Sequence, residues 1–512
     1  MTSPIFMLSE TLSPILDEMR NDTESLHSCM FVNRTWCRLT APILWRAPFK
    51  DRWLDRSSLI TTFIGCLDDA SKEKLKLFSN FPSEALKVPT FDYVYFLREL
   101  HFSTLYDLVK SWCKEQDLNI YTEGDTYLYP ATTILDILVE HFMDKSKYLS
   151  ILSIPIVTHR KGDYVSLSKH DSAARKCLPN IRYFNCDDWV PENLKFASKF
   201  CTNLNRLDID CSWGNDREVS AFIKAQKHLQ HLTVTKRWPN LNDTINIENF
   251  SRSIKCVVLK DNKHQMDNGG PLSVLTSCKN LEIMRFYNWL SLPENDMDAL
   301  VSNYFPRLRK LSFIRCKPTA DMIITMILVN GSNLQELTVS WETSKYDDYS
   351  VIRAIASNCP NLKYLDAPIT RNDLSCFYDM LRSCKKLQNL TINVAKVEEE
   401  YDVDHFLPTM GTIIPESLYQ LNIFASWKFT AESLREFLMN NCKNCFKCLG
   451  FYRSVTDEHL KVITEYANER KSLSYLELRC CEKTSREEIK RAKESISDIA
   501  VYNFTGRRMD YL

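Results

Sequence analysis

Three cysteines toward the end of the chain, Cys442, Cys445 and Cys448, have the spacing most suggestive of chemistry. Thiols separated by two residues are typical ligands of zinc or of an iron–sulfur cluster. The same residues also fit a core, because Cys442 precedes an apolar stretch much as Cys359 does. Either Cys445 or Phe446 would then begin that stretch. We favour packing in a core and predict no metal site here.

No other group of residues in the sequence indicates catalysis. His228 and His231 resemble a pair of metal ligands, but no Cys or His follows at a matching distance. The sequence has no His-Glu-x-x-His motif and no glycine-rich phosphate-binding loop, and only ten of its 512 residues are glycine. We therefore expect no enzyme activity, no catalytic residue and no cofactor. A metal-assisted enzyme centred on the three cysteines is the alternative, and stoichiometric zinc or iron in the purified protein would support it.

The cysteines and histidines discussed above lie within a sequence pattern that repeats along the chain. A Leu-x-x-Leu-x-Leu phrase, or an apolar variant of it, returns roughly every 25 to 28 residues, and two weaker copies lie upstream at 97–102 and 149–154. Alternation of period two within each phrase predicts a short strand with one buried face, and apolar residues at helical spacing before it predict a helix. The twelve phrases begin at Ile181, Leu204, Leu229, Ile254, Leu281, Leu308, Leu334, Leu362, Leu387, Leu418, Phe446 and Leu473.

Neither such a strand nor such a helix can bury its apolar face alone, whereas stacked copies form a continuous core and a curved parallel sheet. The chain resembles the leucine-rich-repeat family, specifically the subclass with about 26 residues per unit and a Cys-x-Asn-Leu or Cys-x-x-Leu sequence leading into the strand. That sequence is found at Cys201, Cys278, Cys359 and Cys384. The resemblance implies an α/β leucine-rich-repeat solenoid, a fold that serves many unrelated partners.

Charge and composition narrow the choice of partners. The chain has 65 basic and 65 acidic residues and a pI near 7.1, so neither nucleic acid nor an acidic membrane is favoured. No apolar run approaches the ~18 residues needed to span a membrane, and no basic stretch precedes an apolar core at the start. We expect a soluble protein of the cytoplasm, the nucleus or both, with its nineteen cysteines reduced.

The first fifty residues predict a compact unit of three helices. One helix begins near Ser9, a second begins near Asp22, and a short apolar stretch at 39–45 contains Pro42 as a turn. The residues on the apolar face of the first helix are Leu12, Ile15, Leu16 and Met19, and those of the second are Leu26, Cys29, Val32 and Trp36. A unit this small buries little surface, so a partner or the adjoining repeats would complete it.

The stretch from Glu24 to Trp45 resembles the F-box, and closely resembles its fungal form. The matching residues are Ser25, Leu26, Cys29, Val32, Trp36, Leu44 and Trp45. The family commonly opens with Leu-Pro, whereas Leu8 is followed here by Ser9, so the start of the first helix departs from the pattern. The resemblance implies docking to a Skp-family adaptor and, through it, to a cullin-RING ligase.

The same resemblance divides nine residues between the small core and an adaptor-binding face. They are Leu8, Leu12, Ile15, Leu16, Leu26, Val32, Trp36, Leu44 and Trp45. The alternative is that the three helices only cap the repeats. The chain is thus divided into an F-box-like domain at 1–50, a helical connector at 51–90, the solenoid at 91–482 and a C-terminal cap at 483–512, where a polar helix would close the stack.

A recognition surface is expected on the strand residues that point away from the core, two and four places after the first apolar residue of each phrase. These positions mix both charge signs with aromatic residues, which suits a protein partner better than nucleic acid. The candidate substrate-binding residues are Arg206, Asp208, Arg285, Lys310, Tyr364 and Asp366.

Together the two modules predict the substrate-recognition subunit of an SCF-type (Skp–cullin–F-box) E3 ubiquitin ligase. The helices would dock the adaptor and the repeats would bind a protein substrate whose identity the sequence does not give. Such a subunit acts by proximity, because tethering the substrate raises its effective concentration at the ubiquitin-transfer enzyme. The alternative is a leucine-rich-repeat interaction scaffold with no ligase role.

Overall fold

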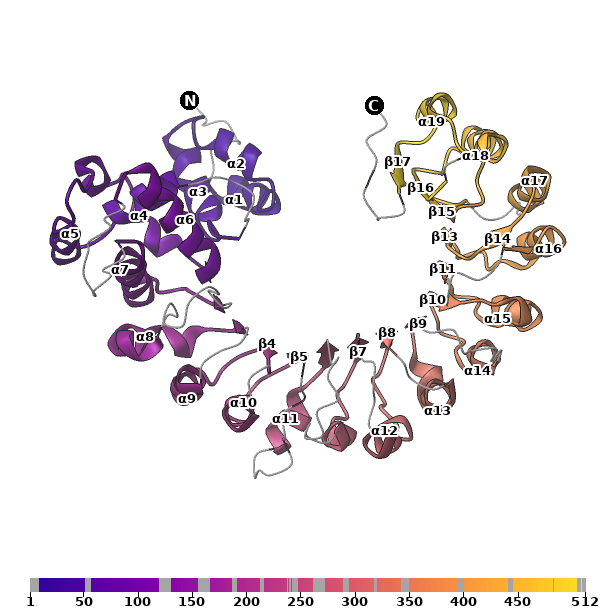
Figure 1. The fold of residues 1–512 in the computed structure, drawn as a ribbon, viewed down its shortest axis with the longest axis horizontal. Coiled ribbons are helices and arrows are strands. Elements are labelled where there is room, and N and C mark those ends of the chain that lie inside the picture. Colours follow the sequence, from indigo (N-terminus) through magenta and orange to yellow (C-terminus); the bar gives the residue numbers. More distant parts are fainter. Residues whose placement is uncertain are drawn as a thin grey trace. The chain divides into compact units, whose positions relative to one another are not determined.

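The computed structural model describes residues 9–50, 57–118, 130–154, 166–186, 191–211, 216–236, 238, 241, 247–260, 272–288, 294–316, 320–341, 350–393, 400–440, 445–481, 483–503 and 508. The chain forms two compact units. The first comprises Met1–Leu232 and Pro239–Ser253, and the second comprises Thr233–Trp238 and Ile254–Leu512. The second unit and the later part of the first are built from strands followed by helices that lie on one side of them (Figure 1).

The first unit begins with three helices, which are α1 (Ser9–Glu18), α2 (Thr23–Cys29) and α3 (Arg34–Leu44). Asp22 caps α2, because its side chain accepts a hydrogen bond from the amide of Ser25 at 3.0 Å. Asn33 caps α3 in the same way, accepting from the amides of Thr35 at 2.9 Å and Trp36 at 3.0 Å. These caps fix where each helix begins.

The helix boundaries differ from the sequence prediction at two points. The helix predicted to extend through Trp36 ends at Cys29, and Val32 lies in the turn that follows. The reason is Asn33, whose side chain begins a new helix. Pro42 lies inside α3 rather than at a turn. Because proline has no amide hydrogen, α3 lacks one backbone hydrogen bond in its last turn.

Further described helices of the first unit are α4 (Ser58–Gly65), α5 (Asp69–Leu75), α6 (Phe102–Glu115), α7 (Pro130–Lys145), α8 (Asp171–Cys177), α9 (Pro191–Phe200), α10 (Asp216–Lys224) and α11 (Ile247–Ser253). Aromatic rings join the three N-terminal helices to this part of the unit. The ring of Phe63 lies 5.4 Å from Trp45 and 5.4 Å from Phe49. It also lies 4.9 Å from Phe142 on α7. The connector is therefore packed against both its neighbours.

The described residues contain a parallel sheet of fifteen strands. The strands of the first unit, in chain order, are β1 (Glu99–His101), β2 (Ile151–Ile154), β3 (Tyr183–Cys186) and β4 (Arg206–Asp210), and β5 (His231–Thr235) spans the unit boundary. Those of the second unit are β6 (Cys256–Lys260), β7 (Ile283–Tyr287), β8 (Lys310–Cys316), β9 (Glu336–Trp341), β10 (Tyr364–Pro368), β11 (Asn389–Asn393), β13 (Gln420–Ile423), β15 (Cys448–Tyr452), β16 (Tyr475–Arg479) and β17 (Asp498–Tyr502).

Helices follow the strands of the second unit in the same way. Those described are α12 (Glu294–Val301), α13 (Ala320–Asn330), α14 (Ser350–Asn358), α15 (Leu374–Ser383), α16 (Phe406–Ile413), α17 (Ala431–Asn440), α18 (Asp457–Arg470) and α19 (Arg486–Ala492). Two short strands, β12 (Tyr401–Asp402) and β14 (Trp427–Lys428), pair separately. Each of the fourteen predicted phrases supplies a strand of the large sheet, and β17 adds one that the phrases did not include.

The core lies between strands and helices and is made by the repeated phrase. In the phrase that begins at Leu362, this residue and Leu365 are fully buried, and Ala367 is almost so. Neighbouring phrases stack their side chains, as shown by the parallel rings of Phe286 and Phe313 with centroids 5.1 Å apart. One side of each strand therefore contributes to the core. The opposite side, which we call the open face, carries the residues two, four and six places after the first apolar residue.

The cysteines that precede the strands are part of this core. Cys278, Cys359 and Cys384 are fully buried free thiols, and burial raises the pKa of each to about 12. The Cys384 thiol donates to the carbonyl of Cys359 at 3.4 Å, which links successive repeats. Thiols held neutral in this way are poor nucleophiles and poor metal ligands.

Candidate protein-binding surfaces

The cysteine-rich segment that suggested a metal site joins the repeat pattern. Phe446 is fully buried and begins the phrase, while Cys445 is exposed and Cys448 is half-buried at the start of β15. Cys442 lies outside the described residues. Within the part of the chain that the structure describes, no group of three or more His, Cys, Asp or Glu residues could hold a metal ion. The described helices also include none long and apolar enough to cross a membrane.

The predicted adaptor-binding residues fall into three groups. Leu12, Leu16 and Leu26 are buried in the small three-helix core, whereas Ile15 is 55% exposed and Val32 is 58% exposed. Leu8 lies outside the described residues. The half-buried residues of the set are Trp36, Leu44 and Trp45.

Two further observations refine this set. The Trp45 ring lies 5.4 Å from the ring of Phe63 in the connector and 4.0 Å from the ring of Tyr93, so its contacts are within the chain. Phe31, which the sequence analysis did not single out, is 76% exposed and is a neighbour of Val32 in the turn after α2. Its position in a turn, outside any apolar periodicity, explains why the pattern missed it. Among the described residues of the segment, the large apolar side chains that are exposed are therefore Ile15, Phe31 and Val32.

The predicted substrate-binding residues lie on the open face of the sheet, but in different places. In the first unit, Arg206 and Asp208 on β4 bind each other at 2.7 Å. Tyr183 on β3 also donates to Asp208, at 2.8 Å, and lies under the Arg206 guanidinium. The charges of Arg206 and Asp208 are therefore satisfied by each other and by contacts with Tyr183.

In the second unit, Lys310 on β8 pairs with Glu336 on β9 at 2.6 Å, and Arg285 is half-buried on β7. A pair this open to water contributes little to stability. Tyr364 and Asp366, the last two predicted residues, both lie on β10. They line a hollow, whereas Arg285 and Lys310 do not.

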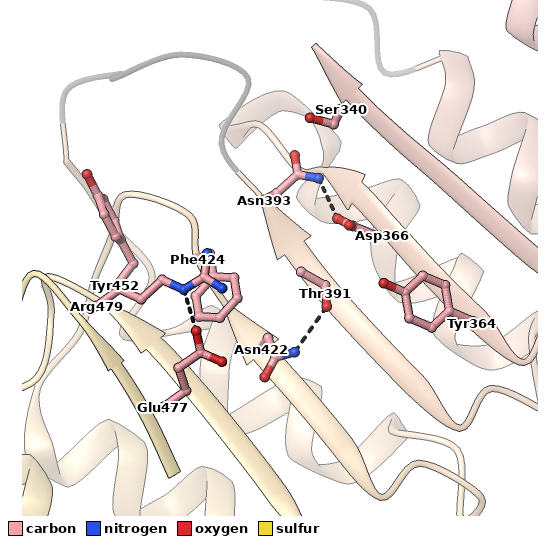
Figure 2. A pocket seen from close by; sticks show the side chains of 10 residues that line it. All are labelled: Ser340, Tyr364, Asp366, Thr391, Asn393, Asn422, Phe424, Tyr452, Glu477 and Arg479. Carbon is pink, nitrogen blue, oxygen red and sulfur yellow. Dashed lines mark hydrogen bonds and ion pairs between the residues drawn. The ribbon is translucent and has the colours of Figure 1, made fainter. Parts of the chain in front are cut away.

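The hollow of about 500 Å³ lies on the open face of the second unit (Figure 2). Its lining residues come from β9, β10, β11, β13, β15 and β16, and from the residue after β13. They are Ser340, Tyr364, Asp366, Thr391, Asn393, Asn422, Phe424, Tyr452, Glu477 and Arg479.

Half of these lining residues share one position that the sequence analysis did not consider. Ser340, Asn393, Phe424, Tyr452 and Arg479 each stand six places after the first apolar residue of their phrases. The prediction stopped at the fourth place. The period of two simply continues to the carboxyl end of the strands, so the signal was present in the spacing.

The charges in the hollow are held by specific partners. The Arg479 guanidinium donates to Glu477 at 2.5 Å and lies 3.9 Å from the centroid of the Phe424 ring. Asp366 accepts a hydrogen bond from the Asn393 amide at 2.5 Å. Burial raises the pKa of the Asp366 carboxyl above its ordinary value, while the Asn393 hydrogen bond and the Arg479 charge oppose that rise.

A glycine leaves the room for this arrangement. A Cβ atom on Gly450 of β15 would lie 2.5 Å from the side-chain oxygen of Asn422 and 3.0 Å from ring atoms of Phe424. Asn422 in turn donates to Thr391 at 3.1 Å on the next strand. The hollow is thus a built surface with fixed polar and aromatic side chains.

Comparisons with known protein families and with curated proteins find no match. Among solved structures, the leucine-rich repeat-containing protein LegL7 from Legionella pneumophila is similar, with 12% identity and a TM-score of 0.35 over 54% of this chain and 92% of that chain. The Rad7 and Elc1 complex from yeast matches with 13% identity and a TM-score of 0.38, over 86% of this chain and 93% of that chain. An internalin (inlF) from Listeria monocytogenes matches with 13% identity and a TM-score of 0.30, over 72% of this chain and 83% of that chain.

The repeats themselves decide the fold class. Each phrase of Leu-x-x-Leu-x-Leu type buries its three apolar residues, supplies one parallel strand and is followed by a helix on the same side of the sheet. This is a leucine-rich-repeat solenoid. The fold leaves its open face available for protein interaction, as predicted from the sequence.

Proposed function

We propose that the chain is the substrate-recognition subunit of an SCF-type E3 ubiquitin ligase of the cytoplasm or nucleus. In this proposal the three N-terminal helices dock a Skp-family adaptor that leads to a cullin-RING ligase, and the repeats bind a protein substrate. The observation that carries the proposal is the division of the F-box-like residues into a buried core and an exposed apolar set.

The exposed set suits an interface because its members are large, apolar and close in sequence. Phe31 and Val32 lie in one turn, and Ile15 lies on α1, which packs against α3. Fully burying one side chain of this size contributes roughly 1.5 to 3 kcal/mol, so three together can anchor a complex. The leucines beneath them hold the backbone and contribute only indirectly.

The proposed mechanism needs no catalytic residue in this chain. A substrate held on the repeats stays near the ubiquitin-transfer enzyme, and its effective concentration there replaces diffusion from solution. The contribution of this chain is then binding and placement, while other subunits perform the transfer.

The test is co-purification of the full chain with a Skp-family adaptor on a sizing column. We expect a 1:1 complex that the double variant Phe31→Asp, Val32→Asp abolishes, because charges at these positions would have to be desolvated in the interface. Leu328→Asp is the matched control, since Leu328 is 60% exposed and lies on α13 in the second unit. It should leave the complex intact.

Melting curves of all three proteins must first show that they are folded. If the folded wild-type chain forms no complex with the adaptor, the proposal is wrong and an interaction scaffold without a ligase role becomes the better account. If the control variant loses the complex as completely as the double variant does, the N-terminal turn is not the docking site.

A further inference from the structure

We propose that the hollow on the open face of the second unit binds a basic side chain, arginine or lysine, of a protein substrate, with Asp366 as its ionic partner. This inference deepens the proposed function, because it assigns a substrate class to the repeat surface. Its evidence is the charge balance, the hydrogen-bonding needs and the size of the hollow.

The charge balance favours a cation. The charged side chains that line the hollow are two carboxylates, Asp366 and Glu477, and one guanidinium, Arg479. Arg479 is committed to Glu477, at 2.5 Å, and to the Phe424 ring beneath it. Asp366 receives its short hydrogen bond from Asn393, which carries no charge. The lining therefore has a net negative charge, carried at Asp366, and an anionic ligand would meet this carboxylate unfavourably.

The hydrogen-bonding needs point the same way. The side-chain oxygen of Asn393 is buried and has no hydrogen-bond partner among the described residues. A buried acceptor without a partner is costly, so a ligand that brings donors gains by filling the place. An arginine side chain carries five donors and a lysine three, and neither has an acceptor. Asp366 and Asn393 together offer a carboxylate and an amide oxygen to such a group.

The size and walls indicate that more than one side chain enters. A volume of about 500 Å³ lies in the range of sites that hold whole ligands, and exceeds what one side chain needs. Rings from Tyr364, Phe424 and Tyr452 form part of the walls (Figure 2). Aromatic faces attract cations and pack against aliphatic stems. We infer that the occupant is a short polypeptide segment with a basic residue at its centre.

Arg479 acts in this scheme as an internal cation that keeps Glu477 neutralised. Replacing it by glutamine would leave two unpaired carboxylates in the hollow and make the lining more negative. The geometry therefore gives two variants with opposite expected effects. Asp366→Asn removes the ionic partner, and Arg479→Gln adds one.

The probe is a library of ten-residue peptides with one fixed central residue, varied over all residue types, and randomised flanks. Binding to the full chain is measured by fluorescence anisotropy. We expect enrichment of peptides with central arginine or lysine, and at least about tenfold weaker binding of these peptides to Asp366→Asn, as for loss of a charged hydrogen bond. Arg479→Gln should bind them more tightly than the wild type.

The matched control is Asp379→Asn, which removes the same charge from α15, on the helical side of the same unit, where the side chain is largely exposed. It should leave peptide binding unchanged. Preference for acidic or phosphorylated peptides, no enrichment at all, or unchanged binding to Asp366→Asn together with weaker binding to Arg479→Gln would each overturn the inference.

Adaptor co-purification of the same variants separates this inference from the proposed function. Peptide selection without adaptor binding would sustain the basic-residue site and reject the ligase role. Adaptor binding without peptide selection would reject only the site. The Arg479 side chain is about half exposed, whereas Asp366 is more buried, so Arg479→Gln is the variant expected to fold in either case. If Asp366→Asn does not fold, peptide binding to Arg479→Gln still tests the inference.

Discussion

The side-chain amide of Asn393 donates to the carboxylate of Asp366 at 2.5 Å, from β11 to the neighbouring strand β10. The same amide donates to the carbonyl of Val339 at 3.2 Å on β9. One side chain thus bridges three strands at the carboxyl end of the sheet. It orients the Asp366 carboxylate toward the hollow and replaces part of the water that burial removes.

This relationship predicts how Asp366 affects stability. Burial raises its pKa in the folded chain above the ordinary value of 3.8, so the ionised form disfavours folding at any pH above the raised pKa. Asp366→Asn should therefore melt at or above the wild-type temperature at pH 7. As the pH falls below 3.8, both states of the wild type become protonated and this difference should disappear. Thermal unfolding at pH 7 and pH 3.5 provides the measurement, and a lower melting temperature of the variant at pH 7 would contradict it.

The buried phrase predicts a large contrast between two leucines in neighbouring elements. Leu311 is fully buried on β8, while Leu328 on α13 is 60% exposed. Leu311→Ala should reduce the free energy of unfolding of its unit by about 2 to 5 kcal/mol, because it leaves a cavity between stacked repeats. Leu328→Ala should change it by less than about 0.5 kcal/mol. Urea unfolding followed by circular dichroism tests both, and similar losses would argue against the described core.

The close approach of Asn422 and Phe424 to Gly450 predicts that a larger residue at this position destabilises the unit. Gly450→Ala places a methyl group against Asn422 and Phe424, and such overpacking typically costs about 1 to 3 kcal/mol. It should also weaken the binding of arginine-centred peptides, because the added methyl group displaces the Phe424 ring, which forms part of the wall of the hollow. Adding Asn422→Ala to Gly450→Ala should recover part of the lost stability by removing the nearest clashing atom. Strictly additive effects of the two substitutions in urea unfolding would contradict direct contact.

The fold was predictable because apolar residues repeat every two positions in a half-buried strand and about every 3.6 positions in a helix. Both spacings are present around residues such as Leu362 and Leu365. The uncertain register at the cysteine-rich segment needed tertiary information. Either Cys445 or Phe446 could begin the phrase by spacing, and the larger apolar ring is the one that fills the core. The short helix break at Asn33 was missed because capping competes with apolar periodicity over a few residues.

The binding surface was predictable only by position, not by partner. Spacing placed Tyr364 and Asp366 on the open face, yet it gave Arg206 and Asp208 equal weight. Their mutual pairing depends on side-chain conformations that spacing does not encode. The side-chain oxygen of Asn393, which has no hydrogen-bond partner among the described residues, likewise depends on contacts across three strands that spacing does not encode.

His459 is buried at the start of α18, where its ring takes part in the helix cap. One ring nitrogen, Nδ1, lies 3.3 Å from the amide of Thr456 and accepts its hydrogen bond, while Nε2 lies 2.9 Å from the carbonyl of Phe429. Neutral imidazole with the proton on Nε2 fits both contacts. Protonation would turn the accepting nitrogen into a donor and remove its hydrogen bond with the Thr456 amide, which is one half of the cap of α18.

Burial accordingly lowers the pKa of His459 below its ordinary value of 6.5 in the folded chain, against the opposing pull of the Phe429 carbonyl. Below pH 6.5 the unfolded chain therefore binds more protons than the folded chain, and stability falls with pH until the lowered pKa is reached. We expect the urea midpoint of the second unit to drop between pH 7.5 and pH 5.5. His459→Gln should flatten this dependence, whereas His405→Gln, which changes an exposed histidine of the same unit, should leave it. An equal pH slope in wild type and His459→Gln would show that other groups govern the acid sensitivity.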